Sequence, residues 1–279
     1  MSDGGPKRRV LLLDNGSLEP AAILRLREIA AALGMRLRHP VEPVSLLHSD
    51  RVAVDLIGGR AAELLEPVME ECGSAGTSEC VILPFFIGPS RALTEYVPAV
   101  VARVGQKHAG MRVKLGQPLH APEDDRLARI LAQQVREILA AENASGLDVR
   151  VALVDHGSPA RAVTAARDRV AKQLAKCLGD AVAEVAPCSM ERRPSAEYVF
   201  NEPLLEKLLG SSGWDQGLVV VAQLFLLPGR HAGKGGDIER ICAHAEAGNA
   251  RLRIRRTGQL GDSPLLLDVL ADRCLEAGG

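Results

Sequence analysis

One segment of this sequence occurs twice, and the repeat restricts the fold more than any other feature. Val10–Ser17, VLLLDNGS, reappears as Val151–Ser158, VALVDHGS. A second pair matches Phe85–Ala92, FFIGPSRA, with Leu224–His231, LFLLPGRH. The members of the two pairs lie 141 and 139 positions apart. Two matches with nearly equal spacing indicate that one unit is duplicated along most of the chain.

Within each copy, short apolar runs typical of buried parallel strands alternate with helical patterns. In the second copy we predict these strands: Val149–Asp155, Ala183–Ser189, Leu218–Leu226 and Leu252–Arg256. Strand–helix alternation gives right-handed crossovers and a parallel sheet. The predicted fold is therefore α/β, with two tandem flavodoxin-like lobes, 1–144 and 145–279. Each lobe has a four-stranded parallel sheet flanked by helices, and Glu142–Leu147 is the predicted linker.

The helix after the first strand of the second lobe has a clear apolar face. Its members recur at helical spacing: Val163, Ala166, Val170, Leu174 and Cys177. We predict Ser158 as the N-cap, Pro159 in the first turn and Gly179 as the stop signal.

Composition excludes several classes of protein. The formal net charge of −1 gives no global basic field for nucleic acid or an anionic membrane, and aromatic residues are only 3% of the chain. The first apolar run, Val10–Leu13, is too short for a signal peptide or a membrane span. The six cysteines are scattered without a Cys-x-x-Cys pair, which indicates reduced thiols and a cytoplasmic protein.

Three residues with metal-binding chemistry follow three different predicted strands of the second lobe. His156 ends the first strand, Glu191 follows the second and His231 follows the third. The carboxyl ends of parallel strands meet at one edge of the sheet, so we expect these side chains to converge. Two imidazoles and a carboxylate suit Fe, Co, Ni or Zn, and they leave coordination positions open. Without a metal, the same groups can accept protons.

The first lobe lacks all three of these residues. Asn15 stands opposite His156, Ala92 opposite His231, and Leu47 opposite Glu191 in a gapped alignment. We therefore predict a single site in the C-terminal lobe, with the N-terminal lobe as its wall.

These motifs carry a family resemblance. Leu153–Ser158 and Leu224–His231 resemble the two histidine motifs of the class II chelatases, with the sirohydrochlorin cobaltochelatases and ferrochelatases as the nearest group. Met190–Ser195 resembles the acidic segment between those motifs. The chain departs from long members of the family, which usually keep the histidines in the N-terminal lobe.

The resemblance implies a lyase that inserts Co²⁺ or Fe²⁺ into sirohydrochlorin, without nucleotide, in the synthesis of cobalamin or sirohaem. Ni²⁺ is a possible alternative metal. His156 and His231 would hold the metal and accept protons, and Glu191 would orient, balance charge or remove a proton. Gly233–Gly236 lacks the spacing of a phosphate-binding loop, and we interpret it as a flexible lid or hinge.

A tetrapyrrole with carboxylate side chains requires local cations rather than a basic protein. Candidates for substrate binding flank the metal residues: Arg230, Lys234, Arg192 and Arg193. Ser158 is a further candidate, because the amides beside it could bind an anion.

Two other functions compete with the chelatase. A cytosolic carrier of a tetrapyrrole or a metal would use the same groups without turnover. A hydrolase with Ser158 as nucleophile is disfavoured, because adjacent residues on a turn rarely reach general-base geometry. Two similar lobes already form an internal pseudo-dimer, so we expect a monomer.

Overall fold

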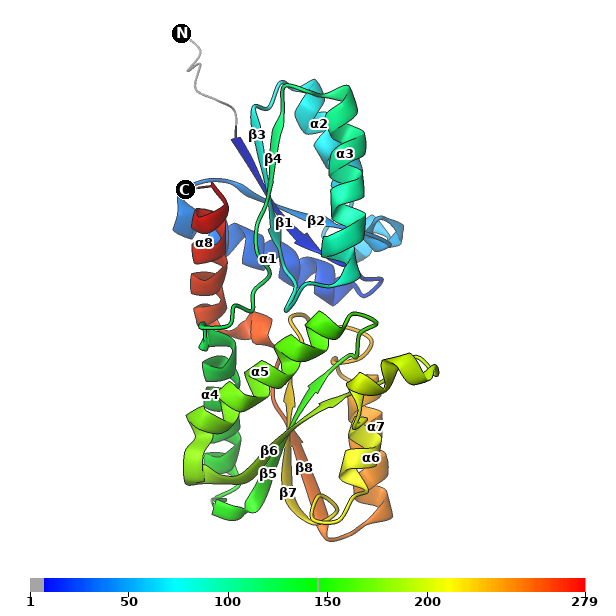
Figure 1. Ribbon diagram of the computed structural model, residues 1–279, viewed down its shortest axis with the longest axis vertical. Coiled ribbons are helices and arrows are strands. Elements are labelled where there is room, and N and C mark those ends of the chain that lie inside the picture. The colour runs from blue at the N-terminus through cyan, green and yellow to red at the C-terminus, as the bar shows by residue number, and fades with distance from the viewer. Residues whose placement is uncertain (1–7, 145, 279) are drawn as a thin grey trace. The chain divides into compact units, whose positions relative to one another are not determined.

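A computed structural model describes residues 8–144 and 146–278 of the chain (Figure 1). It divides into two compact units. Of the described residues, unit 1 contains 8–119 together with 267–278, and unit 2 contains 120–144 together with 146–266.

Unit 1 contains a four-stranded parallel sheet in the order β2-β1-β3-β4. Its strands are β1 Arg8–Asp14, β2 Val41–Ser45, β3 Glu79–Pro84 and β4 Arg112–Leu115. The helices α2 (Leu65–Ser74) and α3 (Val97–Lys107) pack together on one face and bury a continuous apolar cluster against the sheet. The helix α1 (Pro20–Leu37) covers the opposite face (Figure 1).

Unit 2 repeats this plan in the order β6-β5-β7-β8, again with every neighbouring pair of strands parallel. Its strands are β5 Gly146–Asp155, β6 Val182–Ser189, β7 Gly217–Gln223 and β8 Leu252–Arg256. The helices α4 (Arg126–Ala141) and α5 (Arg161–Leu178) pack together on one face, and α6 (Leu205–Leu209) packs with α7 (Asp237–Gly248) on the other (Figure 1). The predicted fold class is confirmed.

Hydrophobic burial explains why β1 and β5 lie at the centres of their sheets. Leu11, Leu12 and Leu13 in β1 are fully buried, as are Leu153 and Val154 in β5. A strand with helices on both faces has no solvent-facing side, so its apolar residues run consecutively instead of alternating.

Two strand ends in unit 2 differ from the prediction. The predicted linker 142–147 extends too far, because β5 already begins at Gly146. The strand β7 stops at Gln223 instead of Leu226. Beyond that point the carbonyls of Phe225 and Leu226 accept hydrogen bonds from the amides of Leu260 and Gly261, so the chain has left the β7–β8 ladder.

The predicted start of α5 is also wrong. The Ser158 hydroxyl accepts a hydrogen bond from the Ala160 amide at 3.1 Å, which forms a local turn ahead of the helix. The helix then begins at Arg161, with no side-chain cap at Ala160. The end at Gly179 agrees with the prediction. Of the predicted apolar face, Ala166, Val170 and Leu174 are buried, whereas Val163 and Cys177 are only half-buried.

The compact units and the sequence repeats differ in their last helices. The helix α4 closes the first repeat but lies within unit 2, and most of α8 (Pro264–Gly278) lies in unit 1 although it closes the second repeat. In unit 1, Asp268 of α8 pairs with Arg36 of α1. Buried Arg273 of α8 donates hydrogen bonds to the carbonyls of Pro118 and Leu119, each at 3.1 Å.

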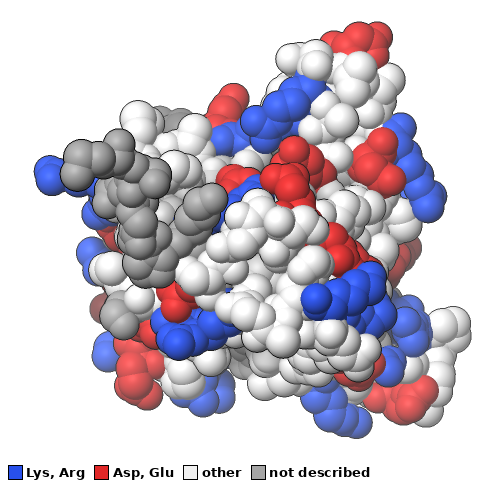
Figure 2. Space-filling view, turned by 90° about the horizontal axis from the view of Figure 1, so that it is seen from above, with Lys and Arg blue, Asp and Glu red and all other residues white. Residues whose placement is uncertain are grey.

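The surface agrees with the balanced composition. Figure 2 shows a face on which Lys and Arg are interspersed with Asp and Glu. Within the described part of the chain, no helix combines the length and the apolar character that a membrane span requires.

The role of α8 in unit 1 can be tested through Arg273. We expect Arg273→Ala to lower the free energy of unfolding by about 2–4 kcal/mol, because the carbonyls of half-buried Pro118 and fully buried Leu119 lose their donor. Leu275→Ala removes a side chain of the same helix that is 60% exposed, and it should change stability by less than about 0.5 kcal/mol. Urea denaturation of the full chain measures both values. Equal effects of the two variants would contradict a specific anchoring role for Arg273.

Candidate active site

The loop after β5 places His156 directly against the loop after β6. Gly157 has a φ of +94°, and a Cβ atom there would lie 1.9 Å from the carbonyl oxygen of Glu191. The Glu191 amide donates a hydrogen bond to the His156 carbonyl at 3.1 Å. Only glycine permits this close approach, so the backbone itself brings residues 156 and 191 together.

His231 lies on the loop between β7 and α7, and this loop folds back onto the start of the helix. The carbonyls of Arg230 and His231 accept hydrogen bonds from the amides of Asp237 and Ile238, at 3.3 and 3.1 Å. A Cβ at Gly236 would lie within 2.9 Å of three backbone carbonyls, so this turn also requires glycine. The glycine-rich stretch 233–236 therefore shapes the loop that holds His231.

His156 contacts both of its predicted partners. Its ring packs edge-to-face on the His231 ring, with centroids 4.6 Å apart and an interplanar angle of 68°. Its Nε2 lies 3.5 Å from Oε1 of Glu191. All three side chains are accessible, with exposed side-chain fractions of 47% for His156, 62% for Glu191 and 32% for His231. The three loops thus meet at the carboxyl ends of β5, β6 and β7.

Each imidazole has its Nδ1 atom engaged. His231 Nδ1 lies 2.6 Å from Oδ2 of Asp237, and His156 Nδ1 lies 3.0 Å from the carbonyl oxygen of Gly157. A carboxylate or carbonyl partner requires a donor, so in the neutral rings Nδ1 carries the proton and Nε2 keeps a lone pair. Both Nε2 atoms are therefore able to bind a cation or accept a proton.

Sequence analysis did not identify Asp237. Hydrogen bonds from Arg240 and then from His231 lower the pKa of its carboxyl group, so Asp237 stays ionised as a partner for His231. In the sequence, Asp237 is visible only as an acidic residue in the first turn of a helix, six positions after His231. The backward fold of the loop, which makes the two residues partners, has no local signature.

A buried polar network lies beneath the His156 loop. Asp155 accepts hydrogen bonds from the Gly157 amide at 3.0 Å and from the Ser189 hydroxyl at 2.6 Å. Arg167 lies 3.7 Å from the same carboxylate and donates to the Ser189 hydroxyl and the Asn201 carbonyl. Burial raises the pKa of Asp155, and the hydrogen bond from Ser189 and the charge of Arg167 oppose this shift. The network joins β5, β6 and α5 below the site.

Unit 1 keeps the carboxylate of this network without the cation. Asp14 accepts hydrogen bonds from the Gly16 amide at 3.0 Å and the Ser45 hydroxyl at 2.6 Å. Leu26 occupies the position 141 residues before Arg167, and it is buried in α1. Burial raises the pKa of Asp14 from 3.8 to about 6.

Unit 1 keeps the same backbone contact at the position that corresponds to the site in unit 2. A Cβ at Gly16 would lie 1.7 Å from the carbonyl oxygen of Leu47, as one at Gly157 would approach Glu191. Leu47 therefore occupies the place of Glu191, in agreement with the gapped alignment. Its side chain is 40% exposed and apolar.

The predicted substrate-binding residues have different surroundings. Arg230 and Lys234 are exposed, and no described residue forms an ion pair with either. Arg192 is committed to its own loop, since it donates to Glu202 and to the carbonyls of Arg193 and Pro194. Arg193 lies over the Tyr198 ring, 5.5 Å from its centroid. The Ser158 amide donates to Asn201 Oδ1 at 2.9 Å, so this amide already has a partner.

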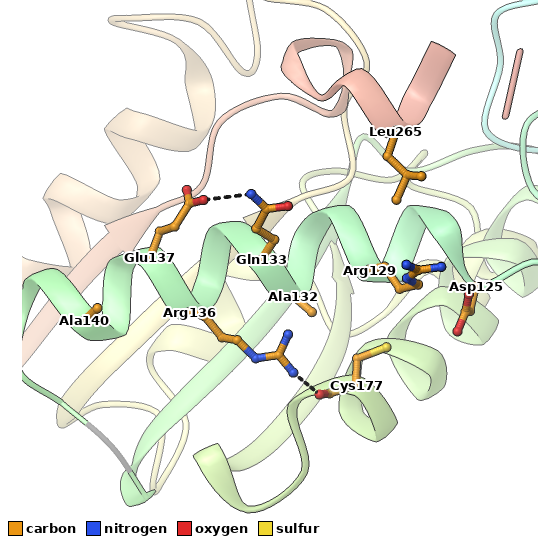
Figure 3. A pocket seen from close by; sticks show the side chains of 9 residues that line it. All are labelled: Asp125, Arg129, Ala132, Gln133, Arg136, Glu137, Ala140, Cys177 and Leu265. Atoms are coloured by element: carbon orange, nitrogen blue, oxygen red, sulfur yellow. Dashed lines mark hydrogen bonds between the residues drawn. The ribbon is translucent and has the colours of Figure 1, made fainter. Parts of the chain in front are cut away.

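A separate pocket of about 660 Å³ lies on the α4–α5 side of unit 2 (Figure 3). None of the described metal-binding candidates lines it. Its polar side chains pair locally, with Gln133 donating to Glu137 and Arg136 to the carbonyl of Cys177. Across residues 8–144 and 146–278, no group of three or more His, Cys, Asp or Glu side chains lies in an arrangement that could hold a metal ion, so His156, Glu191 and His231 are not placed as a set of three ligands.

Comparisons with known proteins support the two-lobed plan. The CbiX family model matches residues 9–138 and again 150–277. The structure of SirB from Bacillus subtilis with Fe³⁺ is 17% identical, with a TM-score of 0.74 over 98% of this chain and 96% of that one. SirB from Bacillus subtilis subspecies spizizenii, a sirohydrochlorin chelatase in complex with cobalt, is 18% identical. Its TM-score is 0.71 over 97% of this chain and 95% of that one. Among proteins of curated function, none matches the sequence.

A third structure extends the fold comparison. CbiX, described as the terminal enzyme for biosynthesis of siroheme in denitrifying bacteria, is 16% identical. Its TM-score is 0.55 over 98% of this chain and 100% of that one.

The buried carboxyl of Asp14 should give stability an unusual pH dependence. The folded state holds this proton more tightly than the unfolded chain, because its pKa is about 6 instead of 3.8. The free energy of unfolding of the wild type should therefore rise relative to Asp14→Asn as the pH falls from about 7 to 4, by up to about 3 kcal/mol. Urea denaturation at several pH values measures this difference. A constant difference between the two proteins would show that Asp14 titrates normally.

Proposed function

We propose a chelatase function for this chain, which belongs to the CbiX family because the model of that family matches both of its halves. The reaction is insertion of Co²⁺ or Fe²⁺ into a sirohydrochlorin-type tetrapyrrole, without nucleotide. The observation that carries the proposal is the contact between His156 and His231, two accessible imidazoles whose Nδ1 atoms are both engaged. The relatives with Fe³⁺ and cobalt support the choice of metals.

The arrangement provides what metal insertion requires. The ring nitrogens of a free-base tetrapyrrole lose protons as they take up the metal, and an imidazole Nε2 accepts protons near neutral pH. The same lone pairs hold a divalent ion before its transfer. Because these side chains are exposed, the ion keeps open positions at which ring nitrogens replace water.

Glu191 and the nearby cations complete the proposed site. The Glu191 carboxylate, 3.5 Å from His156 Nε2, would balance the charge of the metal or receive a proton from His156. Arg230 and Lys234 are free to bind substrate carboxylates. We expect Arg192 to act indirectly by shaping the loop that follows Glu191, and Ser158 to act through the Asn201 contact.

The proposed setting is a cytoplasmic monomer. All six cysteines are free and five are buried, as expected for thiols in a reducing compartment.

Metal insertion can be followed by absorbance with anaerobic sirohydrochlorin and, separately, Co²⁺, Fe²⁺ or Ni²⁺. We expect acceleration over the spontaneous reaction with Co²⁺ or Fe²⁺, and a loss of about 100-fold or more in His156→Ala and His231→Ala. His244→Ala is the matched control, because His244 is an exposed histidine of α7 in the same unit. Binding of the tetrapyrrole without any acceleration would replace the chelatase by a carrier, and acceleration only with Ni²⁺ would change the metal.

Asp237 should act as a positioning residue through His231. We expect Asp237→Asn to lower the insertion rate about 10–100-fold, because the His231 tautomer is no longer fixed by a carboxylate. Nitrogen NMR of labelled histidine should show a shift from the Nδ1-protonated form toward a mixture of tautomers. Arg240→Gln retains the Asp237–His231 hydrogen bond, so its effect should be smaller. An unchanged tautomer in Asp237→Asn would remove this role.

A further inference from the structure

Two arginine–aromatic pairs lie close to the proposed metal site. The Arg161 guanidinium lies over the Phe200 ring, 4.4 Å from its centroid, and Arg193 lies over Tyr198 at 5.5 Å. The two rings contact each other edge-to-face, with centroids 6.2 Å apart. Between them Val199 is 50% exposed. The four side chains form one continuous surface, which we call the Arg–aromatic surface.

Buried Asn201 fastens this surface to the His156 loop. Its side chain accepts a hydrogen bond from the Ser158 amide at 2.9 Å and donates to the Ser158 carbonyl at 3.0 Å. It also donates to the Tyr198 carbonyl at 3.1 Å. On the other side, Arg193 follows Glu191 by two residues. The Arg–aromatic surface is therefore held beside two of the three proposed metal residues.

The position of Arg161 does not stabilise its own helix. Arg161 is the first residue of α5, and the first turn of that helix contains no acidic residue. A cation at a helix N-terminus is opposed by the helix dipole. In unit 1, α1 begins instead with Pro20, which is well suited to a first helical position. The unit that keeps the histidines thus carries a cation that the other unit lacks, at a cost to its helix.

Arg161 is exposed and able to bind an anion. A guanidinium that lies over an aromatic ring can still donate from its N–H groups to a carboxylate. No described residue forms a hydrogen bond or ion pair with the Arg161 side chain. Glu202, a carboxylate just after this segment, is already paired with Arg192 and Lys207, which lower its pKa to about 2.

We propose that the Arg–aromatic surface binds the tetrapyrrole itself and selects a polycarboxylate macrocycle. Arg161 and Arg193 bind carboxylates at the edge of the ring system, and Tyr198 and Phe200 contact its apolar part. The inference rests on the proposed function, because it assigns residues that hold the substrate of that site. In this proposal the Arg–aromatic surface holds the macrocycle, and the histidines hold the metal.

The test measures binding of metal-free sirohydrochlorin to the full chain by fluorescence titration. We expect the double variant Arg161→Gln/Arg193→Gln to raise the Kd about tenfold or more, since two charge-assisted contacts are lost. Phe200→Leu should raise it several-fold. Arg169→Gln is the matched control, because Arg169 is an exposed arginine of the same helix. The affinity for Co²⁺ alone, from calorimetry, should stay unchanged in the double variant.

The outcomes separate this inference from the proposed function. If wild type inserts metal and the double variant binds sirohydrochlorin as tightly as wild type, the inference fails and the chelatase stands. If Arg169→Gln lowered the affinity for sirohydrochlorin as much as the double variant does, the effect would come from net charge alone, and the inference would be overturned. A parallel loss of Co²⁺ affinity would show a general disturbance of the loops and would also overturn it. If wild type neither binds nor metallates sirohydrochlorin, the proposed function fails first.

Discussion

The site depends on a carboxylate that is buried at the end of each central strand. Asp155 and Asp14 each accept a hydrogen bond from the amide two residues later and one from a serine at the end of the neighbouring strand. These bonds hold a tight glycine turn against the next loop. Because an unpaired buried carboxylate is unfavourable, its partners are fixed along with it, and the residue between carboxylate and glycine is presented at the sheet edge.

Both units keep this turn, and they differ in the side chain that the turn presents and in the residues that support it. Unit 2 presents His156 and supports Asp155 with the buried cation of Arg167, whereas unit 1 presents Asn15 and buries Leu26 at the corresponding place. The chain can therefore lose the chemistry of one copy without losing its fold, since the backbone contact of Gly16 with Leu47 matches that of Gly157 with Glu191. Both copies therefore keep the backbone of the glycine turn, whereas the side chains that the turn presents differ between them.

The sequence predicts most of the fold because its signals are local and repeated. Consecutive apolar residues indicate the central strands, and the order of strands and helices then specifies parallel sheets. Contacts made at long range are not visible in the same way. Neither repeat contains a sequence signal that places α4 in unit 2 or most of α8 in unit 1. The partners Asp237 of His231 and Asn201 of Ser158 depend on how loops fold back, which spacing alone does not encode.

An accessible pair of histidines is also a better starting point for transfer than a closed metal cage. A cage with four protein ligands would hold the ion more firmly, but each ligand must then be displaced before the ring nitrogens can bind. Fixing Nδ1 of His231 on Asp237 reduces the freedom of the ring without adding a further ligand. The structure therefore restricts the direction of the lone pairs while leaving the ion exposed to its acceptor. If Arg161 and Arg193 hold the acceptor separately, the affinity for the macrocycle can be strong even though the affinity for the metal stays weak.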